Sequence, residues 1–227
     1  MTSEPTGPAP LSVLIVSASM GAGHDGAARE LSRRLRAGGH RVTVVDYLAA
    51  VPLRLGPVVR SSYKWQLRLA PSTYEASYQT WVDKPSQAGP LATALSAVTG
   101  PALRRWVTQA RPDVIVSTYP LCSLVLGRDR LRGRLAMPVA TFITDFAVHP
   151  LWTHPGVDLH LTVHPQAAAD AQRLSGRAGA APGPLVPKRF MGVEVDGPGA
   201  PAGPGAPGEP EVSGGRGPQR GPGPRIV

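Results

Sequence analysis

The sequence predicts an α/β fold built on a doubly wound, mostly parallel sheet and followed by a disordered Gly/Pro-rich tail. Residues 11–18 form a β-branched apolar run of the kind that is buried on both faces of a parallel sheet. The run ends at a glycine-rich turn over residues 20–26, and a helical pattern follows. Apolar runs and helical patterns then alternate as far as residue 175, which is typical of a Rossmann-like domain.

The first three elements form one βαβ unit. We expect a helix over residues 25–37, because alanines and leucines between positions 27 and 35 share one face and arginines occupy the rest. Gly38 and Gly39 end this helix, and residues 41–46 form the second strand. Such a unit is expected to have a right-handed crossover.

The later elements follow a less regular pattern. Residues 48–84 mix apolar, basic and aromatic side chains without a clean period, which favours short helices. The elements expected after them are one long helix over 87–110, strands over 113–117, 138–144 and 157–163, and helices over 121–131 and 165–174.

The ends of the chain differ in composition from its middle. Residues 197–224 are mostly Gly, Pro and Ala, and such a segment buries too little apolar surface to offset the entropy of ordering it. We therefore expect a disordered leader over 1–10, one domain over 11–195 and a disordered tail over 196–227. Residues 188–195 could form a last strand of that domain.

The composition restricts the compartment and the partners. The 24 Lys and Arg residues exceed the 15 Asp and Glu residues, and a net charge of +9 attracts anionic lipid surfaces or nucleic acid without choosing between them. A single cysteine, Cys122, allows no internal disulfide, which suits the cytoplasm. The first ten residues lack the features of a secretory signal. No apolar run approaches the roughly 20 residues that cross a bilayer, so any membrane contact is expected at the surface.

The glycine-rich turn matches two kinds of site. Gly21, Gly23 and Gly26 follow a strand and open a helix, and Asp46 ends the next strand, as in a dinucleotide-binding fingerprint. In that interpretation the glycines let a pyrophosphate approach the backbone and Asp46 holds a ribose hydroxyl. A tight turn between a strand and a helix explains the same glycines without any ligand.

His24 lies in this turn, near the helix amino terminus and at the carboxyl edge of the sheet, where α/β folds bind their ligands. A helix amino terminus disfavours imidazolium, so the side chain can stay neutral near pH 7. A neutral imidazole can accept a proton from an alcohol. A polar turn residue without a catalytic role is the alternative.

A second group of polar residues follows the strand expected at 138–144. Asp145 ends this strand, and His149 and Trp152 lie on the loop after it. A carboxylate, an imidazole and an indole at that edge can form a polar pocket with an aromatic wall. The alternative is structural: Asp145 caps backbone amides and Trp152 covers the core.

Three segments together resemble one enzyme family. They are residues 17–24, 117–120 and 144–152, which read SASMGAGH, STYP and TDFAVHPLW. Their order and spacing are similar to the amino-terminal domain of the monogalactosyldiacylglycerol synthase and processive diacylglycerol glucosyltransferase family. The resemblance covers about residues 11–175, and its most specific part is Thr-Asp-x-x-x-His-x-x-Trp.

The resemblance implies one half of a two-domain GT-B glycosyltransferase. In that family the amino-terminal domain binds diacylglycerol and the membrane, and the carboxyl-terminal domain binds UDP-galactose or UDP-glucose. The reaction is a single inverting displacement at the anomeric carbon. No cofactor or metal is expected, since the UDP-sugar is the donor substrate.

The resemblance also implies roles for individual residues. His24 is the expected base for the acceptor hydroxyl, and Asp145 and His149 are expected to shape or polarise the site. The residues expected to line the acceptor side of the cleft are Gly21, Gly23, Tyr119 and Trp152.

The basic and aromatic segment gains a role from the same resemblance, because the corresponding region of the family contributes to lipid access. Tryptophan and tyrosine rings suit the headgroup depth of a bilayer, and cations suit anionic lipids. The residues expected at the membrane are Arg60, Tyr63, Lys64, Trp65 and Arg68, with Trp81. This places the chain on the cytoplasmic face of the cell membrane. Filling of the core by the aromatic residues is the alternative.

The sequence departs from the family near residue 190, where a donor domain should begin and the Gly/Pro-rich segment stands instead. We expect the chain alone to be inactive or nearly so. Either the sequence is a truncated or frame-altered product, or a separate polypeptide supplies the donor half.

Three other functions remain open. They are an NAD-linked oxidoreductase, a non-catalytic membrane-surface module, and weak non-specific nucleic-acid binding through tail arginines such as Arg216, without a specific nucleic-acid site. A metal site built from histidines 149, 154, 160 and 164 is not expected, because their spacing matches no common ligand pattern.

Overall fold

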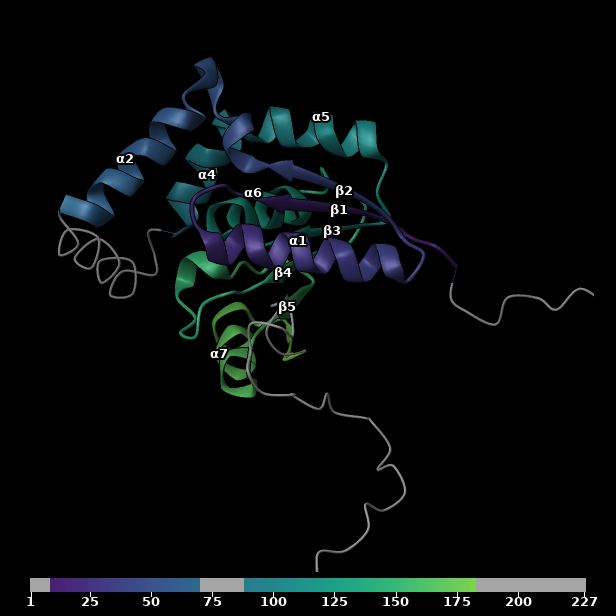
Figure 1. Cartoon of the computed structure of the whole chain (residues 1–227). Helices are drawn as coiled ribbons and strands as arrows, with labels where there is room; N and C mark the ends of the chain where they lie inside the picture. The colour runs from purple at the N-terminus through teal and green to yellow at the C-terminus, as the bar shows by residue number, and fades with distance from the viewer. Residues whose placement is uncertain (1–8, 70–87, 183–227) are drawn as a thin grey trace, which may run out of the picture. The chain divides into compact units, whose positions relative to one another are not determined.

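The computed structural model describes residues 9–69 and 88–182, and they form a six-stranded, entirely parallel sheet (Figure 1). The strands lie in the order β2-β1-β3-β4-β5-β6. They are β1 (Ser12–Ser17), β2 (Arg41–Asp46), β3 (Val114–Ser117), β4 (Val139–Phe142), β5 (Leu159–Leu161) and β6 (Ala178–Ala180). The α/β class and the parallel sheet expected from the sequence are confirmed.

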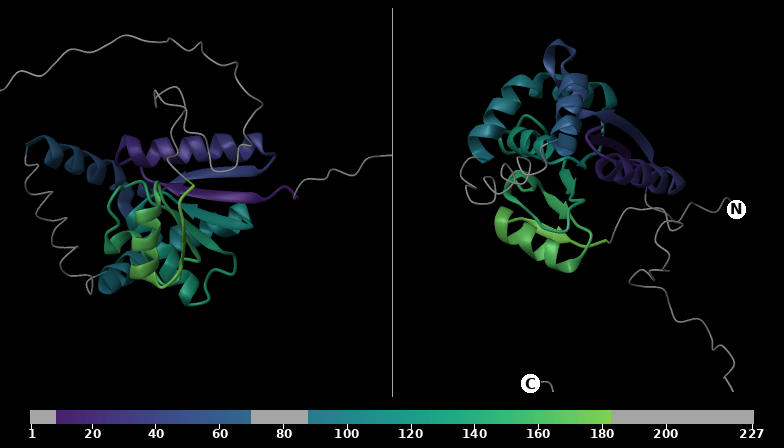
Figure 2. Two further views of the ribbon diagram at one scale, coloured as in Figure 1. Left: turned by 90° about the horizontal axis from the view of Figure 1, so that it is seen from below. Right: turned by 60° about the vertical axis from the view of Figure 1, so that its left-hand side comes forward.

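Helices cover both faces of this sheet, as a doubly wound fold requires (Figures 1 and 2). The α-helices are α1 (Ala22–Ala37), α2 (Gly56–Leu69), α4 (Ala88–Val98), α5 (Gly100–Ala110), α6 (Pro120–Leu131) and α7 (Pro165–Ser175). Short 3-10 helices are η1 (Tyr47–Ala50), η2 (Pro52–Arg54) and η4 (Pro150–Trp152). Helix α1 packs on one face, and α5 and α6 pack on the other.

Strand β1 shows why the first apolar run is continuous. Val13 and Ile15 join the cluster under α1, whereas Leu14 and Val16 join the cluster under α5 and α6. All four side chains are at most 2% exposed. A strand buried on both faces needs apolar residues at every position rather than at alternate ones.

The single helix expected over 87–110 was wrong, because the structure has α4 and α5 with a break at Thr99. Pro101 explains the break. Proline has no N–H to donate, and its ring clashes with the carbonyl four residues earlier, so it is tolerated in a first turn but not inside a helix. Pro101 accordingly lies in the first turn of α5.

Three other differences from the expected elements are found. Helix α1 begins at Ala22 rather than at residue 25, so Gly23 and Gly26 are helical. Strand β6 was not predicted, because Ala-Gly-Ala carries no β-branched or alternating pattern. Its Gly179 has a packing reason, since a Cβ there would come within 2.4 Å of the carbonyl oxygen of Ala168. The segment expected to hold only short helices also contains the 14-residue α2.

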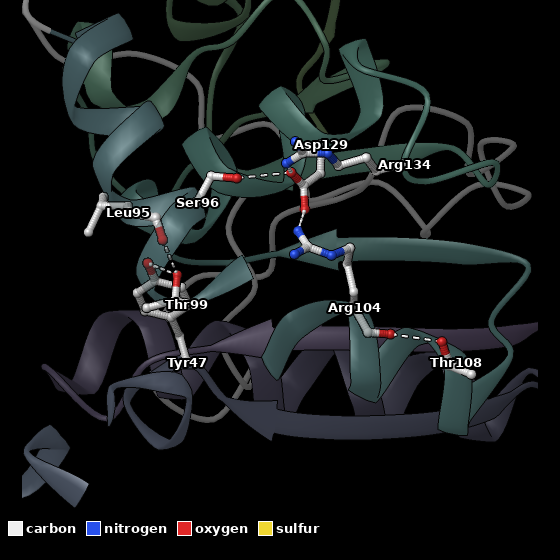
Figure 3. A network of polar contacts seen from close by, with 8 residues as sticks. All are labelled: Tyr47, Leu95, Ser96, Thr99, Arg104, Thr108, Asp129 and Arg134. Carbon is white, nitrogen blue, oxygen red and sulfur yellow. Dashed lines mark hydrogen bonds and ion pairs between the residues drawn. The ribbon is translucent and has the colours of Figure 1, made fainter. Parts of the chain in front are cut away.

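A buried carboxylate ties three helices together (Figure 3). Asp129 of α6 is 1% exposed. It accepts hydrogen bonds from Ser96 Oγ of α4 at 2.9 Å and from Arg104 Nη1 of α5 at 2.6 Å. Arg134 Nη1, from the loop after α6, donates to it at 3.1 Å. Because its neighbours satisfy this charge, the helices that back the sheet are fixed relative to one another.

Several expectations concern residues that the structure does not describe. They are the leader before residue 9, the part of 48–84 beyond Leu69 with Trp81, the strand at 188–195 and the Gly/Pro-rich segment. Within residues 9–69 and 88–182, no helix has the length and apolar character that a bilayer crossing requires.

Candidate active site at the carboxyl edge of the sheet

The strand order places a topological switch point at the carboxyl ends of β1 and β3. Strand β1 lies between β2 and β3, so the chain leaves β1 on one side and returns on the other. Such a switch point is where open α/β sheets bind ligands. His24 follows β1, Tyr119 follows β3 and Thr144 follows β4, so the three residues converge at this edge.

His24 is half-buried in an aromatic and hydroxyl environment. Its ring lies 5.3 Å from the ring of Tyr119, nearly perpendicular to it, and 5.7 Å from that of Trp152, measured between centroids. Its Nδ1 lies 3.3 Å from Thr144 Oγ1. The structure therefore brings His24 to the same place as the segment 144–152, as the sequence predicts.

The environment of His24 favours the neutral imidazole. Burial lowers the pKa of His24 below 6.5, and the nearby Asp145 only partly offsets this effect. His24 is the third residue of α1, where the helix dipole also disfavours a positive charge. The imidazole is therefore mainly unprotonated at neutral pH and able to accept a proton.

Asp145 accepts hydrogen bonds on both carboxylate oxygens. The indole N–H of Trp152 donates to Oδ2 at 2.7 Å, and the Thr144 hydroxyl lies 3.3 Å from Oδ1. His149 Nε2 is 3.6 Å from Oδ2. Burial opposes ionisation, but the hydrogen bonds from His149 and Trp152 outweigh it and lower the pKa of Asp145. The side chain stays 40% exposed, so its negative charge is accessible at this edge of the sheet.

The other expected cleft residues lie deeper than the sequence suggests. Trp152 is fully buried, and His149 and Tyr119 are each 7% exposed. Trp152 thus covers the core and also holds Asp145, which combines the two alternatives considered for it. These three side chains form a rigid wall behind His24 and Asp145.

The loop that carries Asp145 is anchored to helix α7. His164 Nδ1 accepts a hydrogen bond from the backbone N–H of Ala167 at 3.2 Å and caps the helix. Its Nε2 therefore carries the proton and donates to the carbonyl oxygen of Phe146 at 3.0 Å. His164 was considered only as an unlikely metal ligand, and nothing in its spacing indicates this anchoring contact.

The glycines of the first turn are open rather than tightly packed. A Cβ added to Gly21, Gly23 or Gly26 would meet no atom of the described residues within 4 Å. In the dinucleotide fingerprint the third glycine allows close contact between helix and strand, and that contact does not exist at Gly26. Asp46 already accepts hydrogen bonds from Ser19 Oγ at 2.6 Å and from the Leu48 amide at 3.0 Å.

Helix α2 exposes one apolar stripe bordered by cations. Val58, Trp65 and Leu69 lie on one face, at spacings of seven and four residues, and are 61%, 65% and 65% exposed. Lys64 and Arg68 are exposed beside this stripe. Figure 2 shows α2 extending away from the sheet, which leaves this face accessible in the described part of the chain.

Two of the residues expected at the membrane do not share this stripe. Arg60 and Tyr63 are half-buried on the other side of α2. Arg60 Nη1 points to Ser19 Oγ at 3.4 Å. It helps to line a cavity of about 450 Å³ together with Asp46 and Arg54. Residues 48–84 show no clean helical period, so the sequence pattern does not separate the two sides of α2.

Comparison with known proteins identifies the family of the chain. The family model for monogalactosyldiacylglycerol (MGDG) synthase matches residues 24–178. The processive diacylglycerol beta-glucosyltransferase of Bacillus subtilis (strain 168) is 28% identical over 148 residues, which is 64% of this chain and 37% of that protein. The chain therefore spans well under half the length of this curated relative.

Solved structures of the spinosyn rhamnosyltransferase SpnG are also similar. The complex with thymidine diphosphate has a TM-score of 0.42 and 18% identity, and the match covers 75% of this chain and 49% of SpnG. A second SpnG structure has a TM-score of 0.34 and 15% identity, and the match covers 72% of this chain and 39% of SpnG. The family match, which includes His24, Tyr119 and the whole segment 144–152, shows that the chain belongs to the monogalactosyldiacylglycerol synthase family of glycosyltransferases.

Proposed function

We propose that this chain forms the acceptor-binding half of an enzyme that transfers a hexosyl group from a UDP-sugar to diacylglycerol. The observation that carries the proposal is the position of His24. A mainly neutral imidazole stands at the switch point of the sheet, next to the ionised Asp145 and in front of an aromatic wall. This arrangement suits the deprotonation of an alcohol.

The proposed reaction is one inverting displacement. The free hydroxyl of diacylglycerol gives its proton to His24, and its oxygen forms a bond to the anomeric carbon of the sugar. The bond from that carbon to the diphosphate oxygen breaks, and UDP leaves with the electron pair. His24 then returns the proton to solvent. A positioned base contributes about 10²- to 10⁴-fold to the rate of such a step.

Asp145 supports the base electrostatically. When His24 accepts the proton it becomes an imidazolium, and the nearby carboxylate stabilises that charge. Trp152 and His149 hold the carboxylate in place from the buried side. Their role in the proposal is to position Asp145, since both side chains are buried.

We propose that the exposed stripe of α2, formed by Val58, Trp65 and Leu69, binds the surface of an anionic membrane. Apolar side chains enter the headgroup region, and cations such as Lys64 and Arg68 add about 1 kcal/mol each near anionic lipids. This contact would hold the candidate site near its water-insoluble acceptor, on the cytoplasmic face of the cell membrane.

Sedimentation with vesicles tests the membrane contact. The chain should co-sediment with vesicles that contain anionic lipid, and salt should weaken this binding. Leu69→Ser should weaken it several-fold. The matched control is Leu131→Ser, because Leu131 is similarly exposed at 60% but lies at the end of α6. Equal losses for the two variants, or binding to neutral vesicles alone, contradict the assignment.

We propose that the donor substrate binds to a second half, either in the same longer protein or in a separate polypeptide. The test is a complemented transfer assay. The chain is mixed with the part of the Bacillus subtilis relative outside the matched region, radiolabelled UDP-glucose or UDP-galactose, and vesicles containing diacylglycerol. Glycosyl-diacylglycerol should form only with both halves. Turnover by the chain alone contradicts the need for a second half, and no product in any mixture contradicts the proposed transfer.

Thermal shift measurements separate the oxidoreductase from the transferase. An NAD-binding site at Gly21 and Asp46 predicts a rise in melting temperature with NAD. Since Asp46 is already bonded to Ser19 and Leu48, we expect none.

A further inference from the structure

We propose that Thr144 is a positioning residue whose hydroxyl links His24 to Asp145 and thereby fixes which imidazole nitrogen carries the proton. The inference rests on the proposed function, in which His24 is the base, and it names the group that prepares His24 for that role. Thr144 lies two residues beyond the end of β4 and directly before Asp145, so the sheet itself fixes the position of its backbone.

The Thr144 hydroxyl stands between the two chemical groups. Its Oγ1 is 3.3 Å from His24 Nδ1 and 3.3 Å from Asp145 Oδ1. Both distances are long for hydrogen bonds to a hydroxyl. Contacts of this kind are often long without substrate and shorten in the reacting complex.

The direction of this chain of hydrogen bonds follows from the number of protons. The hydroxyl has one proton to donate, and the ionised Asp145 can only accept. If that proton points to Asp145, then His24 Nδ1 must donate its own proton to Oγ1. The opposite arrangement would place a lone pair of Thr144 against a carboxylate oxygen. The Trp152 N–H on Oδ2, at 2.7 Å, keeps the carboxylate ionised and fixes its orientation.

The consequence is that the lone pair of His24 lies on Nε2. Which nitrogen of a histidine is protonated is set by the hydrogen bond that the other nitrogen makes. The His24 ring also meets the backbone carbonyl of Thr118, which raises its pKa against the effect of burial. In the proposal Nδ1 is the nitrogen held by a side chain, at Thr144, and Nε2 is the nitrogen that receives the proton of the incoming hydroxyl. The rings of Tyr119 and Trp152 limit rotation of the imidazole.

The proposed proton transfer involves the acceptor hydroxyl and the two ring nitrogens of His24. The O–H bond of the acceptor breaks, an Nε2–H bond forms, and Nδ1 keeps its proton. The positive charge on the ring is then stabilised by Asp145 through the Thr144 hydroxyl. No proton needs to travel to Asp145, whose carboxylate stays ionised throughout.

Nitrogen NMR of the purified chain tests the tautomer without any transfer reaction. In ¹H–¹⁵N correlation spectra at a pH above the pKa of His24, the unprotonated nitrogen resonates far downfield of the protonated one. Wild-type His24 should show Nδ1–H and an unprotonated Nε2. Thr144→Val should shift the ring towards Nε2–H, the form that water favours, and Thr144→Ser should restore Nδ1–H. The matched control is Thr108→Val, which removes an exposed hydroxyl bonded to the backbone of α5.

The complemented transfer assay supplies the second readout. Thr144→Val should lower kcat about tenfold with little change in KM for diacylglycerol, which is less than the complete loss of a base costs. An Nε2–H tautomer in the wild type overturns the inference even if Thr144→Val does not fold. So does an unchanged tautomer in a folded Thr144→Val variant. Neither result decides whether His24 is the base. That assignment is tested separately by a His24 substitution, which lowers kcat whichever tautomer is present.

Discussion

Asp129 and Asp145 are both held by several hydrogen bonds, yet their surroundings differ in charge and access. Asp129 is 1% exposed and meets two guanidinium groups and a hydroxyl. Asp145 is 40% exposed in its side chain and meets an indole, a hydroxyl and a histidine. Two partners of Asp129, Arg104 and Arg134, carry a permanent positive charge, so the negative charge of Asp129 is neutralised within the fold. Asp145 has no such partner among the described residues, so its charge is available to a neighbour that becomes positive, such as His24.

The histidines differ in the same way between the core and the edge of the sheet. Burial lowers the pKa of both His154 and His160 to about 4. His160 is fully buried on the sheet, and His154 packs so closely on α6 that a Cβ at Gly127 would come within 2.7 Å of it. Burial also lowers the pKa of His24, but this ring stays partly accessible at the carboxyl edge. In the core a neutral histidine is therefore a consequence of packing, whereas at the edge the proposed function uses the neutral ring of His24 to accept a proton.

Lowering the pH should have the largest effect, which is a loss of folding stability caused by the buried histidines His154 and His160. The folded-state pKa values of about 4 lie below the unfolded value of about 6.5, so folding favours the neutral rings. This stability is fully present above pH 6.5 and is lost as the pH falls towards 4, by up to about 1.4 kcal/mol per pH unit for each histidine.

Urea unfolding at several pH values between 7 and 4.5 measures this effect. The free energy of unfolding should fall across the range, and His160→Gln should make the fall shallower. A slope for His160→Gln equal to that of the wild type contradicts the assignment of the pH dependence to this ring. Only the slopes are compared, because the substitution also changes packing.

The second largest effect is expected on enzymatic activity, which should depend on Asp145 and not on Asp129. Asp145→Asn keeps the shape and the acceptor for the Trp152 N–H but removes the charge that stabilises a protonated His24. We expect kcat in the complemented transfer assay to fall about 10²-fold, since a preorganised charge of this kind is worth about 3 kcal/mol in a transition state. A rate within threefold of the wild type removes Asp145 from the mechanism.

Asp129→Asn should give the reverse result, with a smaller free-energy change. Losing the charge that faces Arg104 and Arg134 should lower the free energy of unfolding by about 2 kcal/mol, because hydrogen bonds to charged groups contribute about 1.5–3 kcal/mol. Asp145→Asn should cost less than about 1 kcal/mol. Urea denaturation of both variants at pH 7 measures the difference, and equal losses would remove the contrast between the two carboxylates.

The smallest effects concern two helical glycines. Gly127→Ala in α6 should destabilise the fold by about 1–3 kcal/mol, because the new methyl group collides with His154. Gly26→Ala in α1 should stabilise it by about 0.5–1 kcal/mol, since alanine suits a helix and the space around it is open. Thermal unfolding measures both changes. A destabilised Gly26→Ala variant would indicate a packing role that the structure does not show.

The sequence predicted the parts of the fold that depend on local pattern. The run at 11–18 has apolar residues on both faces, so its burial in a parallel sheet followed directly. Because the carboxyl ends of parallel strands meet at one edge, the meeting of His24 with the segment 144–152 was also predictable. Pro101 is the residue from which a division of the helix at 87–110 can be predicted, because proline is tolerated in the first turn of a helix but not in its interior. The strand at 178–180 owes its place to packing against α7, for which Ala-Gly-Ala holds no signal.

The details of the candidate site were less accessible, because they depend on direction and depth. The depth of Trp152 and His149, the orientation of Arg60 away from the stripe of α2, and the anchoring of the loop by His164 each follow from tertiary packing. The sequence indicates Thr144 only as the first residue of the Thr-Asp-x-x-x-His-x-x-Trp segment. Its position between His24 Nδ1 and Asp145 Oδ1 requires coordinates.

The direct test of the central claim is the rate of the His24→Ala variant in the complemented transfer assay, with His40→Ala as the control. His40 is also half-buried, but its Nδ1 accepts a hydrogen bond from the Leu11 amide, next to the start of β1 and away from its carboxyl end. If His24 removes the proton of the acceptor, kcat should fall about 10²- to 10⁴-fold while KM for diacylglycerol changes only a few-fold. A His24→Ala variant that folds and keeps at least half of the wild-type kcat would contradict the claim.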